Sequence, residues 1–300
     1  MDLKKTVNDI KSLKIQGATN VTKAALMALG SYSKKIKYSS KEEFLRKLNK
    51  AVSLLSNSRP TEPEMRNFLN HVYHNVKTST KNDLNKVTYQ YCREALKLRE
   101  DAFKKIVKYG KNLIKPKSVV YTHCHSSSVT SILKQAFKSK KFEVNNTETR
   151  PVLQGRITAK ELAGAGIRVN HYVDSAMRLA IKNADMVLLG ADSITTTKVI
   201  NKIGSELAAE VAKKYDVPVY ICASSFKFNP ETLYGKQEVI EERSSKEVWQ
   251  KPPKNVMIKN YAFEKINFDN ITAIVSDLGV LDPETFVAEV KQKFVWAKKI

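Results

Sequence analysis

Residues 116–128 read PKSVVYTHCHSSS, and the pattern of the sequence changes across this stretch. Before it, apolar residues recur at helical spacing; after it, short apolar runs alternate with helical patterns. The run 118–122 follows a proline and ends in a polar segment, which is typical of a buried strand that leads into a helix. We therefore expect two domains, a helical one over residues 1–115 and an α/β one over residues 116–300.

The N-terminal part predicts a bundle of four or five helices. Residues 40–43 form a capping box ahead of an apolar stripe, which predicts a helix over 41–56. Residues 61–64 repeat the start signal, with Pro63 in the first helical turn. A longer helical pattern covers residues 82–113.

The C-terminal part predicts a mostly parallel sheet. Apolar runs fall at residues 118–122, 142–147, 168–172, 186–189, 218–222 and 271–275. Helices are expected at about 127–139, 158–165, 175–183, 201–214 and 284–296. This alternation is typical of a doubly wound, Rossmann-like domain with helices on both faces of its sheet.

The charge of the chain is strongly positive, with 52 Lys and Arg against 30 Asp and Glu, a net charge of +22. Such a field attracts nucleic acids and phosphorylated ligands. However, 42 of the 52 basic residues are lysines, whereas proteins that read nucleic acids favour the rigid arginine fork. We interpret the excess mainly as solvated lysine faces, and RNA binding by the helical domain stays open as an alternative.

The composition also indicates the compartment. No apolar run reaches the roughly 18 residues of a membrane span, and the first residues lack the apolar core of a signal peptide. The three cysteines, Cys92, Cys124 and Cys222, have no Cys-x-x-Cys spacing. We expect a cytoplasmic protein with reduced thiols and no membrane partner.

Two strand ends carry reactive side chains, and ligands of such sheets bind outside the carboxyl ends of the strands. Cys124 follows the first run, where the start of a helix can lower a thiol pKa and bind phosphate. Asp192 follows the run 186–189 and can act as a proton shuttle. A buried structural thiol and a loop-bracing carboxylate are the alternatives.

A third strand end predicts an anion site. Asn201 and Lys202 fall at the expected start of the helix over 201–214, where a lysine and free helical amides can cradle a phosphate. The turns at 16–20 and 57–61 can present amides or a guanidinium to an anion, or can be plain helix punctuation. Neither a P-loop nor a Gly-x-Gly-x-x-Gly motif is present, which disfavours nucleotide hydrolysis and nicotinamide cofactors.

His123 and His125 flank Cys124 and raise zinc as an alternative. Three donors so close together in the chain do not easily converge on one ion, and the other histidines show no helpful spacing. We expect no metal site.

Taken together, these segments resemble the superfamily that unites the regulatory subunits of eukaryotic translation initiation factor 2B, methylthioribose-1-phosphate isomerase and archaeal ribose-1,5-bisphosphate isomerase. The matching stretches lie at residues 17–18, 59–61, 122–126, 147–151, 154–155, 173–176, 190–193, 199–204 and 226–228. The resemblance implies a helical domain followed by a Rossmann-like domain, and a homodimer or larger homo-oligomer.

The resemblance also implies an activity. The isomerases keep a Cys and the Asp of Gly-Ala-Asp as the proton-transfer pair, which correspond to Cys124 and Asp192. The implied reaction is the aldose–ketose isomerisation of a phosphosugar, foremost ribose 1,5-bisphosphate, without a metal or organic cofactor and with AMP as a candidate activator. The residues implied to bind the phosphates are Gly17, Ala18, Arg59, Ser126, Asn201 and Lys202.

Several positions depart from the isomerase pattern. Gln16 stands where the isomerases commonly have Arg, Glu62 and Glu64 add acidic charge after Arg59, and Glu264 replaces an Asp. These departures keep a second interpretation open, a non-enzymatic regulatory subunit that binds the α-subunit of initiation factor 2 and a phosphorylated small molecule.

Overall fold

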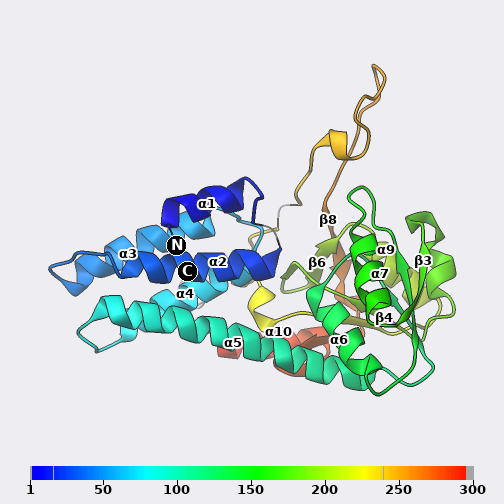
Figure 1. The fold of residues 1–300 in the computed structure, drawn as a ribbon, viewed down its shortest axis with the longest axis horizontal. Helices are drawn as coiled ribbons and strands as arrows, with labels where there is room; N and C mark the ends of the chain where they lie inside the picture. Colours follow the sequence, from blue (N-terminus) through cyan, green and yellow to red (C-terminus); the bar gives the residue numbers. More distant parts are fainter. Residues whose placement is uncertain (1, 16, 239, 295–300) are drawn as a thin grey trace.

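The computed structural model describes residues 2–15, 17–238 and 240–294, and its first part is a bundle of helices (Figure 1). Asp2, Ser40 and Asp83 cap three of them by accepting a hydrogen bond from the amide three residues on, which satisfies amides that have no partner within the helix. The helical bundle is therefore confirmed. Its helices are α1 (Leu3–Lys11), α2 (Ala18–Ser33), α3 (Lys41–Ser56), α4 (Pro63–Thr78) and α5 (Leu84–Leu113).

The second part contains a seven-stranded sheet in the order β10-β9-β7-β4-β1-β2-β3, in which only β10 pairs antiparallel. Its strands are β1 (Val119–Thr122), β2 (Glu143–Thr147), β3 (Arg168–Tyr172), β4 (Met186–Leu189), β7 (Val219–Cys222), β9 (Ala273–Ser276) and β10 (Gly279–Leu281). The helices of this part are α6 (Ser127–Phe137), α7 (Gln154–Gly164), α8 (Met177–Ile181), α9 (Ser205–Lys214) and α10 (Pro283–Lys293). The predicted α/β class and all six predicted strands are confirmed.

Alternate side chains of the strands bury two separate cores, because successive residues of a strand point to opposite faces. Val120 and Leu188 join the core beneath α6, α7 and the end of α5. Tyr121 and Leu189 join the core that also contains residues of α8, α9 and α10. The sheet is therefore covered on both faces, as the doubly wound prediction requires.

The helical bundle and the sheet share the second of these cores. Phe68 of α4 stacks on Phe226 with ring centroids 3.9 Å apart. The side-chain amide of Asn67 donates to the carbonyls of Phe226 and Phe228, both at 2.7 Å. Because a shared core and buried hydrogen bonds join the bundle to the α/β part, the bundle packs firmly against the carboxyl edge of the sheet.

A second, antiparallel sheet was not predicted. It consists of β5 (Ser193–Ile194), β6 (Lys198–Lys202) and β8 (Phe263–Asn267), in the order β5-β6-β8. The expected helix over 201–214 therefore begins only at Ser205, since Asn201 and Lys202 are the last residues of β6. The structure also corrects the helix over 158–165, which begins already at Gln154, and the last predicted helix, which ends at Lys293; residues 295 and 296 lie outside the described part.

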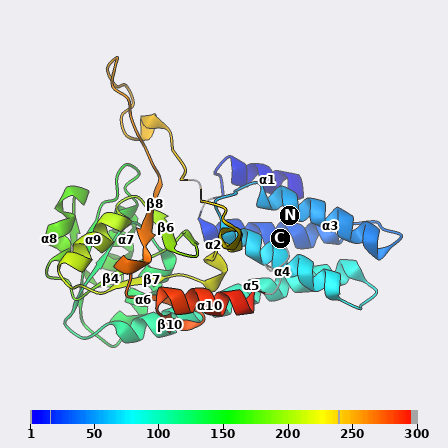
Figure 2. The same ribbon diagram turned by 180° about the vertical axis from the view of Figure 1, so that it is seen from behind.

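An arm, residues 240–262, leads into the edge of this second sheet and projects away from the molecule (Figure 2). Its two legs are joined at the base, where the Ala262 amide donates to the Glu241 carbonyl at 2.9 Å and the Arg243 amide donates to the Asn260 carbonyl at 2.8 Å. Among the described residues we find no helix with the length and apolar character that crossing a bilayer requires.

Candidate active site

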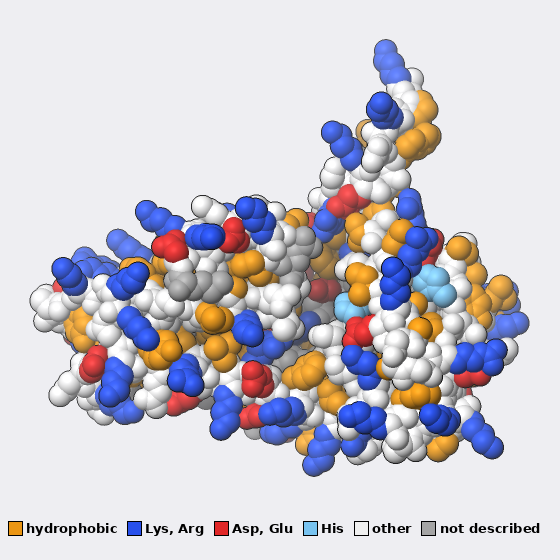
Figure 3. Space-filling model, viewed as in Figure 1, with side chains coloured by type: hydrophobic (Ala, Val, Ile, Leu, Met, Phe, Trp, Pro, Cys, Tyr) orange, Lys and Arg blue, Asp and Glu red, His pale blue; other side chains and the backbone are white. Residues whose placement is uncertain are grey.

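The site lies where the strand order of the large sheet reverses, between β1 and β4. The crevice outside the carboxyl ends of two such strands is where doubly wound proteins bind ligands. Cys124 follows β1 and Asp192 follows β4, so the two residues with candidate chemistry flank this crevice. Figure 3 shows the molecule hollowed where the helical bundle meets the sheet.

Cys124 occupies an unusual backbone conformation, with φ 65°. Its amide donates to Thr149 Oγ1 at 2.9 Å, and its carbonyl accepts from Thr158 Oγ1 at 2.7 Å. A positive φ is uncommon for a residue with a side chain, and here two threonines hold it. The thiol is thereby fixed at the end of β1, only 8% exposed.

His123 and His125 are engaged by other partners and do not converge with Cys124. His123 Nε2 lies 2.9 Å from the Ile203 carbonyl and so carries the proton, while Nδ1 lies 2.6 Å from Thr147 Oγ1. His125 Nδ1 lies 3.1 Å from Thr158 Oγ1. Within the described ranges, no group of three or more His, Cys, Asp or Glu side chains is placed to hold a metal ion.

Asp192 is brought to the crevice by Gly190 and Ala191. A Cβ on Gly190 would lie 2.8 Å from Ser126 Oγ, so only glycine lets the end of β4 pass so close to the cap of α6. Burial raises the pKa of the Asp192 carboxyl, and the nearby charges of Lys227 and Lys202 oppose this shift. Asp192 therefore lies in a group of cations rather than at a solvated loop.

Lys202 is one of these cations and is itself only 7% exposed. Of the residues that the structure describes, none accepts a hydrogen bond from its ammonium group. Its Nζ lies 5.0 Å from the centroid of the Phe263 ring. Its charge acts on both Cys124 and Asp192. An ammonium group with unused donors at the end of a largely buried side chain favours an anionic ligand.

Glu264 occupies the helix start that the sequence suggested for phosphate. Its Oε1 accepts from the Glu206 amide at 2.6 Å, and its carboxylate also faces the amides of Gly204 and Ser205. The prediction of free amides at the start of α9 is therefore wrong, because a carboxylate from β8 already caps them. Asn201 is also buried here and donates to Ser205 Oγ at 2.9 Å.

Arg59, in the loop between α3 and α4, enters the same crevice. Its Nε lies 3.7 Å from Glu62 Oε1, and one of its terminal nitrogens lies 3.6 Å from Glu241 Oε2. Burial, together with the charge of Asp192, raises the pKa of Glu62 to about 8, although the charges of Lys227 and Arg59 oppose the shift. Glu62 Oε2 and Arg59 Nε are buried without a hydrogen-bond partner among the described residues.

The first turn of α2 reaches this corner through Arg99. Gly17, with φ 79°, is the N-cap of α2 and provides no capping side chain. Arg99 donates to Thr19 Oγ1 at 2.5 Å and lies 3.3 Å from Glu64 Oε1. Thr19, directly after Gly17 and Ala18, is thus linked through Arg99 to the first turn of α4, while Gln16 lies outside the described residues.

Three residues of the site were not assigned from the sequence, namely Glu62, Lys227 and Glu241. Lys227 donates from Nζ to the carbonyl of Ala191, directly before Asp192. Lys227 could have been found from the sequence, because it lies in the stretch 226–228 that resembles the superfamily. Glu62 was noted only as added acidic charge, and Glu241 lies at the base of the arm, whose position no sequence pattern indicates.

Comparison with known proteins finds relatives over nearly the whole chain. The sequence profile of the initiation factor 2 subunit family matches residues 14–283. The chain is 36% identical to ribose 1,5-bisphosphate isomerase of Thermococcus kodakarensis, over 97% of this chain and 94% of that protein. It is 38% identical to the protein of that name from Pyrococcus furiosus, over 97% and 93%. A solved structure described as translation initiation factor eIF-2B of Pyrococcus horikoshii superposes with a TM-score of 0.79 at 23% identity, over 94% of this chain and 98% of the other.

Proposed function

The chain belongs to the initiation factor 2 subunit family, and from this premise we propose that it is a phosphosugar isomerase that converts ribose 1,5-bisphosphate to ribulose 1,5-bisphosphate. The observation that carries the proposal is the placement of Cys124 and Asp192 at the adjacent ends of β1 and β4, with the charge of Lys202 acting on both. The relatives named ribose 1,5-bisphosphate isomerase support the choice of substrate.

The proposed reaction opens the ring and moves two protons, while O1 keeps its phosphate. Asp192 gives a proton to the ring oxygen O4 as the C1–O4 bond breaks, Cys124 Sγ removes the proton from C2, and the electron pair of that C–H bond forms a double bond between C1 and C2. Asp192 then takes the hydroxyl proton from O2 and Cys124 returns its proton to C1, so that C2 becomes a ketone and C1 becomes a methylene group that carries the phosphate. Lys202 and Lys227 stabilise the negative charge that develops on O4 and O2.

The phosphates of the substrate require further cations and amides. We assign this role to Lys202 and Asn201 on one side, and to Ser126, Arg59 and the first turn of α2 at Gly17 and Ala18 on the other. The reaction as written needs no metal and no organic cofactor.

Conversion of ribose 1,5-bisphosphate by the purified protein tests the proposal, with and without AMP. Cys124→Ser is the matched variant, because it replaces one atom of a buried side chain and should leave the unfolding midpoint nearly unchanged. We expect turnover by the wild type and none by the variant. Full activity in the variant would show that Cys124 is not a catalytic residue. No turnover by a folded wild type would contradict the isomerase assignment.

One observation favours a second function. Arg59 already lies 3.6 Å from Glu241 Oε2, and this negative charge weakens its attraction for a phosphate. A site of this kind suits a regulatory subunit that binds the α-subunit of initiation factor 2 together with a phosphorylated small molecule. A pull-down with that subunit at near-physiological salt tests it: association without isomerase turnover supports the regulatory function, and turnover without association excludes it.

A further inference from the structure

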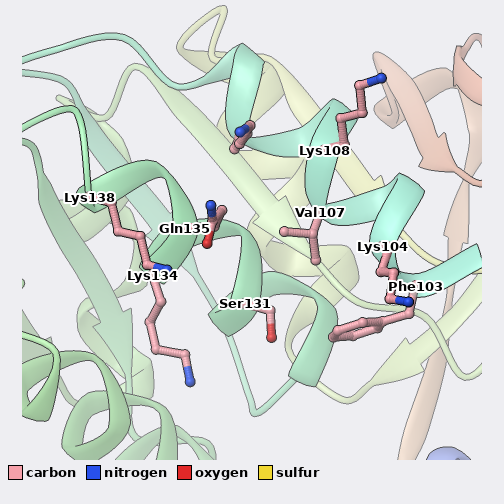
Figure 4. A pocket seen from close by; sticks show the side chains of 9 residues that line it. Phe103, Lys104, Val107, Lys108, Ser131, Lys134, Gln135 and Lys138 are labelled. Atoms are coloured by element: carbon pink, nitrogen blue, oxygen red, sulfur yellow. The ribbon is translucent and has the colours of Figure 1, made fainter. Parts of the chain in front are cut away.

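A groove of about 540 Å³ lies between α5 and α6, and none of the residues that line it belongs to the candidate active site. Three lysines of α5 and two of α6 and its cap form its walls, as Figure 4 shows for four of them. These lysines are Lys104, Lys108, Lys111, Lys134 and Lys138. The groove is therefore separate from the candidate active site, and its walls are positively charged.

The charge around this groove is concentrated and unbalanced. Residues 102–142 contain ten lysines and no Asp, Glu or Arg, so this segment alone contributes +10 to the net charge of +22. Lys104 and Lys134 have carboxylate partners, in Asp101 and Glu161. The ammonium groups of the other three groove lysines have no carboxylate within ion-pair distance among the described residues, which leaves their charge available to an external anion.

The spacing of these lysines forms a linear track. Lys104, Lys108 and Lys111 follow one another at intervals of four and three residues on α5, which places their Cα atoms roughly 6 and 4.5 Å apart along the helix axis and on one face. Lys134 and Lys138 repeat the four-residue interval along α6. Two facing rows of cations suit a chain of anionic groups better than a single small anion.

The floor between the two rows is partly aromatic and partly polar. Phe103 is half-buried, and its ring is directed across the groove toward α6 (Figure 4). Ser131 and Gln135 of α6 lie between the lysine rows and offer hydrogen-bonding groups. Aromatic surfaces that bases can stack on, set within a basic groove, are the recurrent features of sites for single-stranded nucleic acid.

We propose that the α5–α6 groove binds single-stranded RNA, with phosphates on the two lysine rows and a base stacked on Phe103. Ser131 and Gln135 are positioned to bond the 2′-hydroxyl, the group by which proteins distinguish RNA from DNA. This activity is independent of phosphosugar isomerisation, since it uses other residues on another part of the molecule.

The test is fluorescence anisotropy with a labelled 12-nucleotide oligouridine, titrated with the full chain over a range of salt concentrations. The groove variant is K108Q/K111Q/K138Q. The matched control is K50Q/K160Q/K182Q, which removes the same charge from exposed positions on other helices and one connecting loop. We expect the groove variant to bind at least about tenfold more weakly, with the slope of log affinity against log salt reduced by about 2, since each lost phosphate contact on a single strand contributes about 0.7.

Two further probes identify the ligand class. Phe103→Leu should weaken the oligouridine complex about tenfold and leave binding of an abasic strand unchanged, because base stacking is then the contribution removed. Equal losses of affinity in the groove and control variants would overturn the proposal, because RNA would then bind through the overall positive charge of the protein. Tighter binding of polyglutamate than of RNA at equal charge would also overturn it, in favour of an acidic protein partner. Binding of the corresponding DNA strand as tightly as RNA would overturn the role of Ser131 and Gln135.

Discussion

Cys124 is a neutral thiol at neutral pH, because burial raises its pKa to about 12 even though the charge of Lys202 opposes the shift. A base must first lose its proton, and below the pKa the thiolate fraction increases tenfold for each pH unit. We therefore expect kcat/KM for ribose 1,5-bisphosphate to rise by up to about tenfold per unit between about pH 7 and pH 9. A pH profile of initial rates measures this, and a flat profile over that range would show that another group is the base.

Lys202 gives a second prediction at this scale, because its side chain is largely buried and its ammonium has no acceptor among the described residues. Lys202→Met keeps the length and the apolar contacts of the side chain and removes the charge. Loss of one charge-assisted contact to a phosphate or to the developing oxyanion corresponds to roughly 1.5–3 kcal/mol, or about a 10- to 150-fold decrease in kcat/KM. Lys198→Met, at the other end of β6, is the control. Similar activity in both variants would show that Lys202 does not act on the substrate.

The buried carboxyl of Glu62 makes the stability of the folded protein depend on pH. Its pKa is raised to about 8 in the folded protein, so between its ordinary value of 4.5 and about 8 the folded state binds a proton that the unfolded state has lost. Stability must then fall as pH rises through this window, by up to roughly 1.4 kcal/mol per pH unit. Urea unfolding at several pH values should show this slope for the wild type and a shallower one for Glu62→Gln. Parallel slopes would contradict the buried, proton-binding carboxyl.

The positions of the two candidate reactive residues were predictable from the sequence, whereas their surroundings were not. Cys124 and Asp192 each follow an apolar run, and the edge of a parallel sheet brings such positions together by geometry alone. Glu241 reaches Arg59 from the base of the arm, which lies far along the chain, through a contact that no local pattern encodes. The charge balance of the site is therefore a property of the tertiary structure.

At the scale of elements, the turn between β6 and α9 requires a glycine for two reasons. Gly204 has φ 99°, and a Cβ there would lie 2.7 Å from His123 Nε2. Gly204→Ala should destabilise the protein by about 1–3 kcal/mol, because backbone strain and displacement of a buried histidine add together. At Gly164, the last residue of α7, a Cβ would meet no atom of the described chain within 4 Å. Gly164→Ala should therefore be neutral or stabilising by up to about 1 kcal/mol.

Chemical denaturation of the two glycine variants measures both effects in one assay. Gly164→Ala is the control for alanine substitution as such. A midpoint for Gly204→Ala equal to that of the wild type would mean that the turn can adopt another conformation and does not fix His123.

The same turn shows why one helix was predicted too long. Residues 199 and 200 are apolar and continue into a helical pattern, so the sequence favours a helix from Asn201 onward. In the structure β6 pairs with β8, and Asn201 lies opposite Glu264. The partner strand lies far away along the chain, so no local pattern indicates that residues 198–202 pair as a strand.

At the scale of the whole molecule, the arm carries exposed apolar side chains that nothing in the described chain covers. Met257 is 79% exposed and Trp249 is 49% exposed, and Val248 and Val256 also lie open to solvent. Aromatic residues and methionine are enriched at the centres of protein interfaces, and exposed apolar side chains gain free energy by packing on another surface. We infer that a second copy of this chain covers the arm in the homo-oligomer that the resemblance implies.

Light scattering coupled to size exclusion tests the role of the arm in self-association. W249E/M257E places two charges on the proposed contact, which should shift the wild-type oligomer toward the monomer mass of 33.9 kDa because buried unpaired charges are costly. Leu179→Glu, at a residue of α8 that is 56% exposed, tests whether a charge on any exposed apolar side chain has this effect. We expect the control to keep the oligomer. An unchanged mass for the double variant would locate the interface elsewhere, and dissociation of both would show that the arm has no special role.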